Sequence, residues 1–234
     1  MDELFNEINE FSKNSKITKY THPCKIYGSP QDMLFIIYYK NFLTNAIANQ
    51  YFCIFEQNLI YNSAEKSKIK ICGIDHNIPR KQVAYGSPGT FYNFSGIKVN
   101  AISWNDKNNI CVVLSDLRSL LKKYFNCDFN FVLINRYANG NDHIGYHSDD
   151  ENDLVPNSPI VGITLGAERD FKFKNIENLN NFQFDKSDSL LLHHGSCIAI
   201  NFPTNHYWKH GIPKRSNVKS PRISLTFRMM KILT

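Results

Sequence analysis

Apolar residues recur at helical spacing in three stretches before residue 129. They do so in residues 1–14, from Phe42 to Ile60 with Asn41 as the expected N-cap, and over Ile110–Phe125. We therefore expect three amphipathic helices, the first of them short. Between the first two, the stretch Thr18–Pro30 is polar and rich in turn-forming residues, which predicts a loop.

After residue 129 the pattern changes to short runs rich in β-branched and aromatic residues. Gly, Pro, Asn and Asp separate these runs, as in an antiparallel sandwich or jelly roll. With two earlier runs, the expected strands are Met33–Tyr38, Lys81–Tyr85, Asn130–Tyr137, Pro159–Leu165, Asp170–Lys174, Ser189–His193, Cys197–Phe202, Tyr207–Gly211 and Arg222–Arg228. Helices first and strands second predict an α+β fold in which helices cover one sheet. We expect one domain over 31–234 and an extension, a short helix and a loop, over 1–30.

Composition narrows the classes of protein. The 234 residues are 42% hydrophobic, which is enough to bury a core and argues against a disordered chain. The longest apolar run, Met33–Tyr39, is far shorter than the roughly 20 residues of a membrane-spanning helix. The acidic N-terminus does not resemble a secretory signal, and the six cysteines are scattered without a C-x-x-C pair. We expect an intracellular protein that is not secreted, and its formal charge of +6 permits a polyanionic partner.

One small group of residues has the composition of a metal site. His147 and Asp149 are two residues apart, so in an extended segment they point to the same side. His210 can supply a third ligand. Two imidazoles and one carboxylate on one face of a metal form the facial triad of non-haem Fe(II) oxygenases, which leaves positions open for a co-substrate and O2. The spacing alone is weak evidence, because it arises by chance in many chains.

The terminal strand carries a second feature. Polar residues alternate there with apolar ones, so four polar side chains share one face: Arg222, Ser224, Thr226 and Arg228. If that face points inward, its arginines need an anionic partner. A dicarboxylate such as 2-oxoglutarate would supply one through a bidentate contact to Arg222, with hydrogen bonds from Asn135 and Tyr137. An exposed face with solvated arginines fits this segment equally well.

These features belong to a longer series of motifs. In chain order the motifs are Asn135-Arg136-Tyr137, His143-Ile144-Gly145, His147-Ser148-Asp149-Asp150-Glu151, Ser158-Pro159-Ile160, Pro203-Thr204-Asn205, His210 and Pro221 to Arg228. Over about residues 70–230 they resemble the AlkB family of Fe(II)- and 2-oxoglutarate-dependent nucleic-acid dealkylases. Further segments make the chain most similar to the animal homologue that acts on double-stranded DNA: Pro79-Arg80-Lys81-Gln82, Tyr85-Gly86 and Tyr92-Asn93-Phe94-Ser95-Gly96.

The resemblance implies a fold, cofactors and a reaction. The fold would be a double-stranded β-helix (jelly-roll) core backed by the N-terminal helices, with a nucleotide-recognition segment over 65–100. Fe(II), 2-oxoglutarate and O2 would be required. The reaction would be oxidative demethylation of 1-methyladenine and 3-methylcytosine in DNA, a direct-reversal repair. The target base would flip out of the helix, because a methyl group on its pairing edge is inaccessible within the stack.

The resemblance also implies residue roles. His147, Asp149 and His210 would bind iron, and Asp150 would act as a catalytic residue that orients the site. The residues that hold 2-oxoglutarate would be Asn135, Tyr137, Arg222, Ser224 and Arg228. The substrate-binding residues would be Tyr92, Phe94, Ser95, Glu151, Cys72, Arg80 and Arg215. Among these, Phe94 would stack on the flipped base opposite His147, and Tyr92 and Glu151 would lie near the edge of that base.

The chain departs from the family pattern at three places. Ser224 replaces a usual asparagine, which predicts weaker binding of 2-oxoglutarate. Ile71-Cys72-Gly73 aligns with a hairpin tip where the double-strand homologue carries an aromatic wedge, and a cysteine cannot stack on bases. The loop Asn175–Asn181 is neutral to acidic where that homologue is basic. The hairpin tip and the loop together favour single-stranded DNA or damaged duplex as the substrate.

The remaining expectations concern partners. Phosphate contacts can come from a set of basic residues: Lys66, Lys68, Lys70, Arg80, Lys81, Lys209, Lys214, Arg215 and Lys219. Ordinary solvated surface charge is the alternative interpretation of each. RNA is the alternative substrate, and a nucleic-acid-binding module without turnover or a protein hydroxylase are the alternative functions. We expect a monomer that acts in the nucleus and does not associate with membranes.

Overall fold

The computed structural model describes residues 24–28, 30–63, 67–71, 73–94, 97–106, 108–176 and 189–232. The helix expected over residues 1–14 lies outside this part of the chain. The elements are, in order, β1 (Cys24–Tyr27), the short 3-10 helix η1 (Pro30–Asp32), β2 (Ile36–Tyr39), α2 (Asn45–Asn58), β3 (Lys68–Ile71), β4 (Ile74–Asn77), β5 (Lys81–Gly86), β6 (Phe91–Phe94), β7 (Ile97–Asn100), β8 (Ile102–Ser103), α3 (Asn109–Phe125), β9 (Phe131–Tyr137), β10 (Ile144–His147), β11 (Ile160–Gly166), β12 (Arg169–Asn175), β13 (Ser189–Leu192), β14 (Cys197–Ile200), α4 (Thr204–Tyr207), β15 (Trp208–Ile212) and β16 (Arg222–Arg228).

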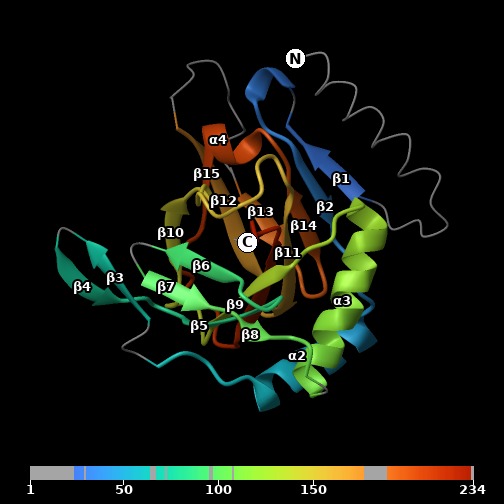
Figure 1. Cartoon of the computed structure of the whole chain (residues 1–234). Coiled ribbons are helices and arrows are strands. Elements are labelled where there is room, and N and C mark those ends of the chain that lie inside the picture. Colours follow the sequence, from blue (N-terminus) through green and yellow to red (C-terminus); the bar gives the residue numbers. More distant parts are fainter. Residues whose placement is uncertain are drawn as a thin grey trace.

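Two sheets form the body of the molecule (Figure 1). The major sheet has the strand order β1-β2-β14-β11-β16-β9-β5-β8, and the minor sheet has the order β10-β15-β12-β13. Their strands pair antiparallel, apart from β5 with β8. Side chains of both sheets pack together between them, among them Ile36 and Ile198 of the major sheet and Phe171 and Trp208 of the minor sheet. The expected α+β fold with a jelly-roll core is confirmed.

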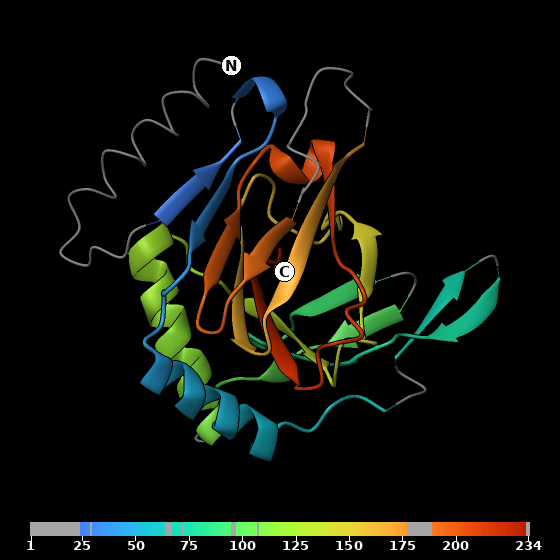
Figure 2. The same cartoon turned by 180° about the vertical axis from the view of Figure 1, so that it is seen from behind.

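Helices α2 and α3 cover the outer face of the major sheet, as Figures 1 and 2 show. Phe55 of α2 and Leu114 of α3 pack in one core cluster with Ile134 of β9 and Leu225 of β16, and all four are fully buried. The expectation that helices back one sheet is therefore confirmed. No helix in the part of the chain that the structure describes is long and apolar enough to span a bilayer.

Strand β16 buries both of its faces. Ile223, Leu225 and Phe227 pack in the core beneath the helices, whereas Arg222 and Arg228 line a cavity on the opposite face. The predicted alternation is confirmed. The alternative of solvated arginines is wrong, because Arg222 and Arg228 are only 2% and 3% exposed.

Side chains cap the N-termini of both helices, but the cap of α2 is not the predicted residue. The N-cap of α2 is Thr44, whose hydroxyl accepts a hydrogen bond from the Ile47 amide at 3.4 Å, and not Asn41. The helix starts later than predicted because Phe42 and Leu43 are buried in the core before it begins. Helix α3 begins after Asn108 and matches its prediction within one residue.

Several short strands were not predicted from the sequence. Strand β1 lies inside the expected loop Thr18–Pro30, and β6, β7 and β10 were not expected as strands. Each has four residues, too few for a clear period of two, and each gains its strand conformation from a hydrogen-bonded neighbour. Strand β12 also runs one residue into the loop expected at Asn175–Asn181, and residues 177–188 lie outside the described part.

The β3–β4 hairpin projects from the body on the side away from α2 and α3 (Figure 2). Ile71 pairs with Ile74, so the hairpin turns between these two residues. This is the tip that the sequence comparison located, although Cys72 itself lies outside the described residues. A backbone hydrogen bond of 3.0 Å from Ile78 to Ser67 closes the base of the hairpin.

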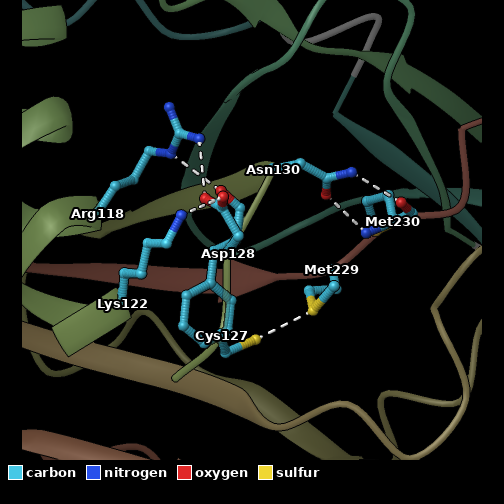
Figure 3. A network of polar contacts seen from close by, with 8 residues as sticks. Arg118, Lys122, Cys127, Asp128, Asn130, Met229 and Met230 are labelled. Carbon is cyan, nitrogen blue, oxygen red and sulfur yellow. Dashed lines mark hydrogen bonds and ion pairs between the residues drawn. The ribbon is translucent and has the colours of Figure 1, made fainter. Parts of the chain in front are cut away.

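A polar network lies where the end of α3 meets the segments beside β9 and β16 (Figure 3). Asp128 lies between two basic side chains of α3, 2.7 Å from Lys122 and 3.6 Å from Arg118. The side chain of Asn130 forms two hydrogen bonds with the backbone of Met230, at 2.7 and 2.8 Å. The ion pairs are exposed and contribute little, but the paired amide fixes β9 against the residues that follow β16.

Leu114→Ala should destabilise the fold strongly, because Leu114 is fully buried where α3 packs on the major sheet. We expect a loss of about 2–5 kcal/mol in the free energy of unfolding, measured by urea denaturation. Val112→Ala in the same helix is the control: Val112 is 54% exposed, so its loss should stay within about 0.5 kcal/mol. Equal losses for the two variants would contradict this packing.

Candidate active site

The predicted metal ligands come together on the minor sheet. His147 ends β10, Asp149 follows two residues later, and His210 lies in β15, where it pairs directly with His147. His147 Nε2 lies 3.7 Å from one oxygen of Asp149, and His210 Nε2 lies 3.8 Å from the other. The three ligand atoms lie within 4.8 Å of one another, so one ion can contact all three.

A hydrogen bond sets the tautomer of His147. Its Nδ1 lies 3.0 Å from the carbonyl oxygen of Gly145. Because a carbonyl oxygen only accepts hydrogen bonds, Nδ1 carries the proton and donates it. The lone pair is then on Nε2, the atom that faces Asp149, which is the arrangement that a metal-binding imidazole needs.

Burial keeps the second imidazole neutral. His210 is 5% exposed, and burial, together with the neighbouring His147, lowers the pKa of His210 to about 3. A neutral imidazole has a lone pair available for a metal. The environment of His210 therefore favours its metal-binding form at physiological pH.

A buried ion pair holds the third ligand. Arg228 Nη2 lies 2.7 Å from Asp149 Oδ1, and both side chains are 3% exposed. Burial alone would raise the pKa of Asp149, but the charge of Arg228 and the two imidazoles outweigh burial and hold this pKa below its ordinary value. Asp149 is therefore an ionised carboxylate, the form that binds a cation.

Next to these ligands, the inner face of the major sheet carries a row of polar side chains. Asn135 of β9 pairs with Ser224 of β16, which pairs with Thr164 of β11. Two residues further along these strands, Tyr137 pairs with Arg222. All five residues line the cavity that also contains the three metal ligands. The structure thus brings together the residues that the resemblance assigns to 2-oxoglutarate.

Arg222 is a buried cation that lacks an anionic partner in the described residues. Its Nη2 donates to the hydroxyls of Thr164 at 2.9 Å and Ser224 at 3.3 Å. Its Nε and Nη1 atoms are buried and have no hydrogen-bond partner among the described residues. Burial lowers the pKa of Arg222 to about 10, which still leaves it charged at neutral pH. Such a group is costly unless an anion binds it, and its unpaired N–H groups are available to a carboxylate.

The charges of the cavity favour an anion. Its lining contains the guanidinium groups of Arg80, Arg222 and Arg228 against the single carboxylate of Asp149. Three positive charges and one negative charge leave an excess of two before the metal binds, and Fe(II) adds two more, so the cavity favours an anion such as 2-oxoglutarate. The donor set of two imidazoles and a carboxylate fits Fe(II) equally well. Both groups that the family implies therefore fit the residues present.

Two of the predicted substrate residues lie beside the metal ligands. The ring of Tyr92 packs against the guanidinium of Arg228, 4.6 Å from its centroid. The Tyr92 hydroxyl donates a hydrogen bond to Glu151. Burial raises the pKa of Glu151 above its ordinary value, and its Oε2 is buried without a hydrogen-bond partner in the described residues. Glu151 does not line the cavity of the metal ligands but an adjoining hollow that Asp149 also lines, and its carboxylate lies near Arg228 and Asp149.

The other predicted site residues lie elsewhere or outside the described part. Asp150 is exposed and lines a second hollow. Arg215 forms an ion pair with Asp170. Phe94 ends β6, but its side chain lies outside the description, as do Ser95 and Cys72 entirely. The roles assigned to these residues stay predictions.

Gln82 and Thr164, which were not predicted as site residues from the sequence, also line the cavity. Gln82 is 3% exposed and pairs with Asn135, so it extends the polar row to a fourth strand. The sequence places Gln82 between Lys81 and Val83 in a predicted strand. One short strand does not show which of its two faces points inward, so Gln82 could not be assigned to the cavity. Thr164 shows its role only through its hydrogen bond to Arg222.

Another residue that was not predicted from the sequence is Arg169, a fully buried arginine at the start of β12. It donates hydrogen bonds to the backbone carbonyls of Asn139, Asp142 and Pro213, at 2.6 to 3.2 Å. These carbonyls belong to the segments between β9 and β10 and between β15 and β16. Arg169 therefore connects the two loops that adjoin β10 and β15, the strands that carry the histidine ligands.

Comparison with known proteins extends this result. The model of the 2OG-Fe(II) oxygenase superfamily matches residues 35–228. The human protein named DNA oxidative demethylase ALKBH2 is 39% identical over 190 residues, which cover 78% of this chain and 69% of the relative. Its Arabidopsis thaliana counterpart is 27% identical, covering 83% of this chain and 66% of the relative. The human alpha-ketoglutarate-dependent dioxygenase alkB homolog 3 is 30% identical, covering 50% and 42%.

A solved structure agrees on the fold. The structure of OsALKBH1 superimposes with a TM-score of 0.55 at 12% identity, covering 88% of this chain and all of that chain. The extent of the family match and the 39% identity to ALKBH2 accord with the triad and the arginine-lined cavity. The chain belongs to the AlkB branch of the 2OG-Fe(II) oxygenase superfamily.

Proposed function

We propose that this chain is an Fe(II)- and 2-oxoglutarate-dependent dioxygenase that removes methyl groups from ring nitrogens of DNA bases, with 1-methyladenine and 3-methylcytosine as substrates. The observation that carries the proposal is the facial triad beside a buried arginine whose free N–H groups have no partner among the described residues. Relatives that are named DNA oxidative demethylases support DNA as the substrate.

The residues divide the work of binding. His147, Asp149 and His210 would hold Fe(II), and Arg222, supported by Thr164, would bind a carboxylate of 2-oxoglutarate. Asn135 and Tyr137 would add hydrogen bonds from the neighbouring strand. When bound, Fe(II), 2-oxoglutarate and O2 together supply the oxidation of the methyl group, which leaves as formaldehyde while 2-oxoglutarate becomes succinate and CO2. The ion pair between Arg228 and Asp149 orients the carboxylate ligand throughout.

The charge of the lesion explains how the site would choose its base. Methylation of a pairing-edge nitrogen leaves adenine or cytosine positively charged at neutral pH. Glu151 offers a buried carboxylate oxygen near the metal ligands, and Tyr92 orients this carboxylate through its hydroxyl. A cationic base is therefore favoured over an unmodified, neutral one. Phe94 would stack on the flipped base, as the family pattern implies.

We further propose that the substrate is single-stranded DNA or damaged duplex. The hairpin turns between Ile71 and Ile74, and Cys72 in this part of the sequence cannot stack in place of a flipped base as an aromatic side chain would. RNA is the second candidate substrate, because the base chemistry is the same. A binding module without turnover is disfavoured by the complete triad. We propose a monomeric protein of the nucleus with a domain boundary near residue 30.

Asp149→Asn should abolish demethylation. The amide removes the negative charge that binds the metal but keeps an oxygen that can accept the hydrogen bond from Arg228, whereas alanine would also remove this acceptor and leave the buried guanidinium without it, at about 3–5 kcal/mol. We expect formaldehyde release from a methylated oligonucleotide to fall at least about 100-fold, with bound iron lost.

The control for this variant is Asp116→Asn in α3, which lies outside the cavity. It should release formaldehyde at the rate of the unmodified protein. Activity of Asp149→Asn close to that of the control would refute the assigned metal site.

Cys72→Phe should raise the rate on duplex DNA selectively. A phenyl ring at the hairpin tip can fill the gap that a flipped base leaves, which lowers the cost of extrusion. We expect the unmodified protein to act faster on one methylated base in a single strand than in the matching duplex, and the variant to narrow this difference. Rates are measured as formaldehyde release from DNA single strand, DNA duplex and RNA of one sequence.

Asn77→Phe places the same ring at the base of the hairpin, on an exposed position of β4, and serves as the control. It should leave the ratio of the two rates unchanged. Comparable rates of the unmodified protein on duplex and single strand would contradict the proposed preference. A faster rate on RNA than on either DNA would assign RNA as the substrate.

A further inference from the structure

We propose that Arg80 is a positioning residue of the co-substrate pocket, and that it acts by orienting the side-chain amide of Asn135. The sequence predicted a phosphate contact for Arg80, but its side chain lines the same cavity as the metal ligands and Arg222. The inference rests on the proposed function, because it concerns the binding of 2-oxoglutarate.

Backbone hydrogen bonds fix the segment that contains Arg80. Its amide donates to the carbonyl of Ile78 at 2.8 Å, and the carbonyl of Pro79 accepts from the amide of His143 at 3.2 Å. Ile78 also closes the base of the β3–β4 hairpin through Ser67. The segment Ile78–Arg80 therefore connects the hairpin to the residues that lead into β10, the strand that ends at His147.

The side chain of Arg80 determines how Asn135 faces the cavity. Arg80 Nε donates a hydrogen bond of 3.0 Å to Asn135 Oδ1, and Asn135 is only 6% exposed. A guanidinium has donors and no acceptor, so only the oxygen of the amide can face it. The NH2 group of Asn135 must then point away from Arg80, where its two hydrogens can bind an acceptor such as a carboxylate. Without Arg80, the amide can rotate and present its oxygen, which repels a carboxylate.

This arrangement links two functions. The hairpin belongs to the segment expected to recognise nucleic acid, and Asn135 belongs to the row of polar residues expected to bind 2-oxoglutarate. A single hydrogen bond between Arg80 and Asn135 connects them across 55 positions of the sequence. A disturbance of the hairpin base would therefore change the affinity for the co-substrate before any nucleic acid binds.

The test is the affinity for 2-oxoglutarate of the full chain loaded with Mn(II), measured by calorimetry without nucleic acid. Arg80→Met keeps the length of the side chain and its packing but removes the donor. It should weaken binding of 2-oxoglutarate about 10-fold or more, as expected for the loss of a hydrogen bond from a charged group. Its melting temperature and Mn(II) affinity should stay close to those of the unmodified protein.

The matched control is Lys81→Ala, which removes the neighbouring, exposed cation and should leave this affinity unchanged. A double-mutant cycle decides between mechanisms. If Arg80 acts through Asn135, Arg80→Met combined with Asn135→Ala should bind no more than about 3-fold weaker than Asn135→Ala alone. If the double variant instead weakens binding of 2-oxoglutarate by the product of the two single effects, Arg80 contacts the co-substrate independently of Asn135, which would overturn the inference.

An unchanged affinity for 2-oxoglutarate in Arg80→Met, with a raised KM for the methylated oligonucleotide, would also overturn it and restore the phosphate contact. The proposed function is tested separately by formaldehyde release. An unmodified protein that binds 2-oxoglutarate in the predicted pattern yet releases no formaldehyde would refute the function and leave the role of Arg80 standing.

Discussion

The ion pair between Asp149 and Arg228 is the interaction on which the site depends. Its two side chains are almost completely buried and lie 2.7 Å apart. Neither charge is stable there alone, because burial of an unpaired charge costs several kcal/mol. The pair joins the loop after β10, which carries a metal ligand, to the end of β16, whose other arginine faces the co-substrate pocket. One contact thus sets the metal site and the pocket relative to each other.

The alternation of side chains between the two faces of the major sheet makes the buried ion pair possible. On β9 and β16 every second side chain faces the helices and completes an apolar core, which allows the intervening side chains to be polar and buried. Asn135, Ser224 and Thr164 meet because their strands are adjacent and in register. The apolar face supplies the free energy of folding, and the polar face can keep a cation such as Arg222 without an anionic partner of its own in the described chain.

Much of this could be predicted from the sequence, and the failures have physical causes. The polar face of Arg222–Arg228 follows from a period of two over seven residues, and the motif around His147 located the metal site through its family resemblance. The contact of Arg80 with Asn135 could not be predicted, because it depends on the register of β5 against β9. The cap of α2 was misplaced because Phe42 is buried before the helix begins, which its apolar character does not reveal.

The central claim is that a metal on the triad and 2-oxoglutarate on Arg222 occupy one cavity between the two sheets. A crystal structure of the full chain with Mn(II) and 2-oxoglutarate tests it most directly. We predict that the metal contacts His147, Asp149 and His210, and that a carboxylate of 2-oxoglutarate accepts a hydrogen bond from the guanidinium of Arg222. Metal bound away from these three residues, or 2-oxoglutarate bound without contact to Arg222, would contradict the account.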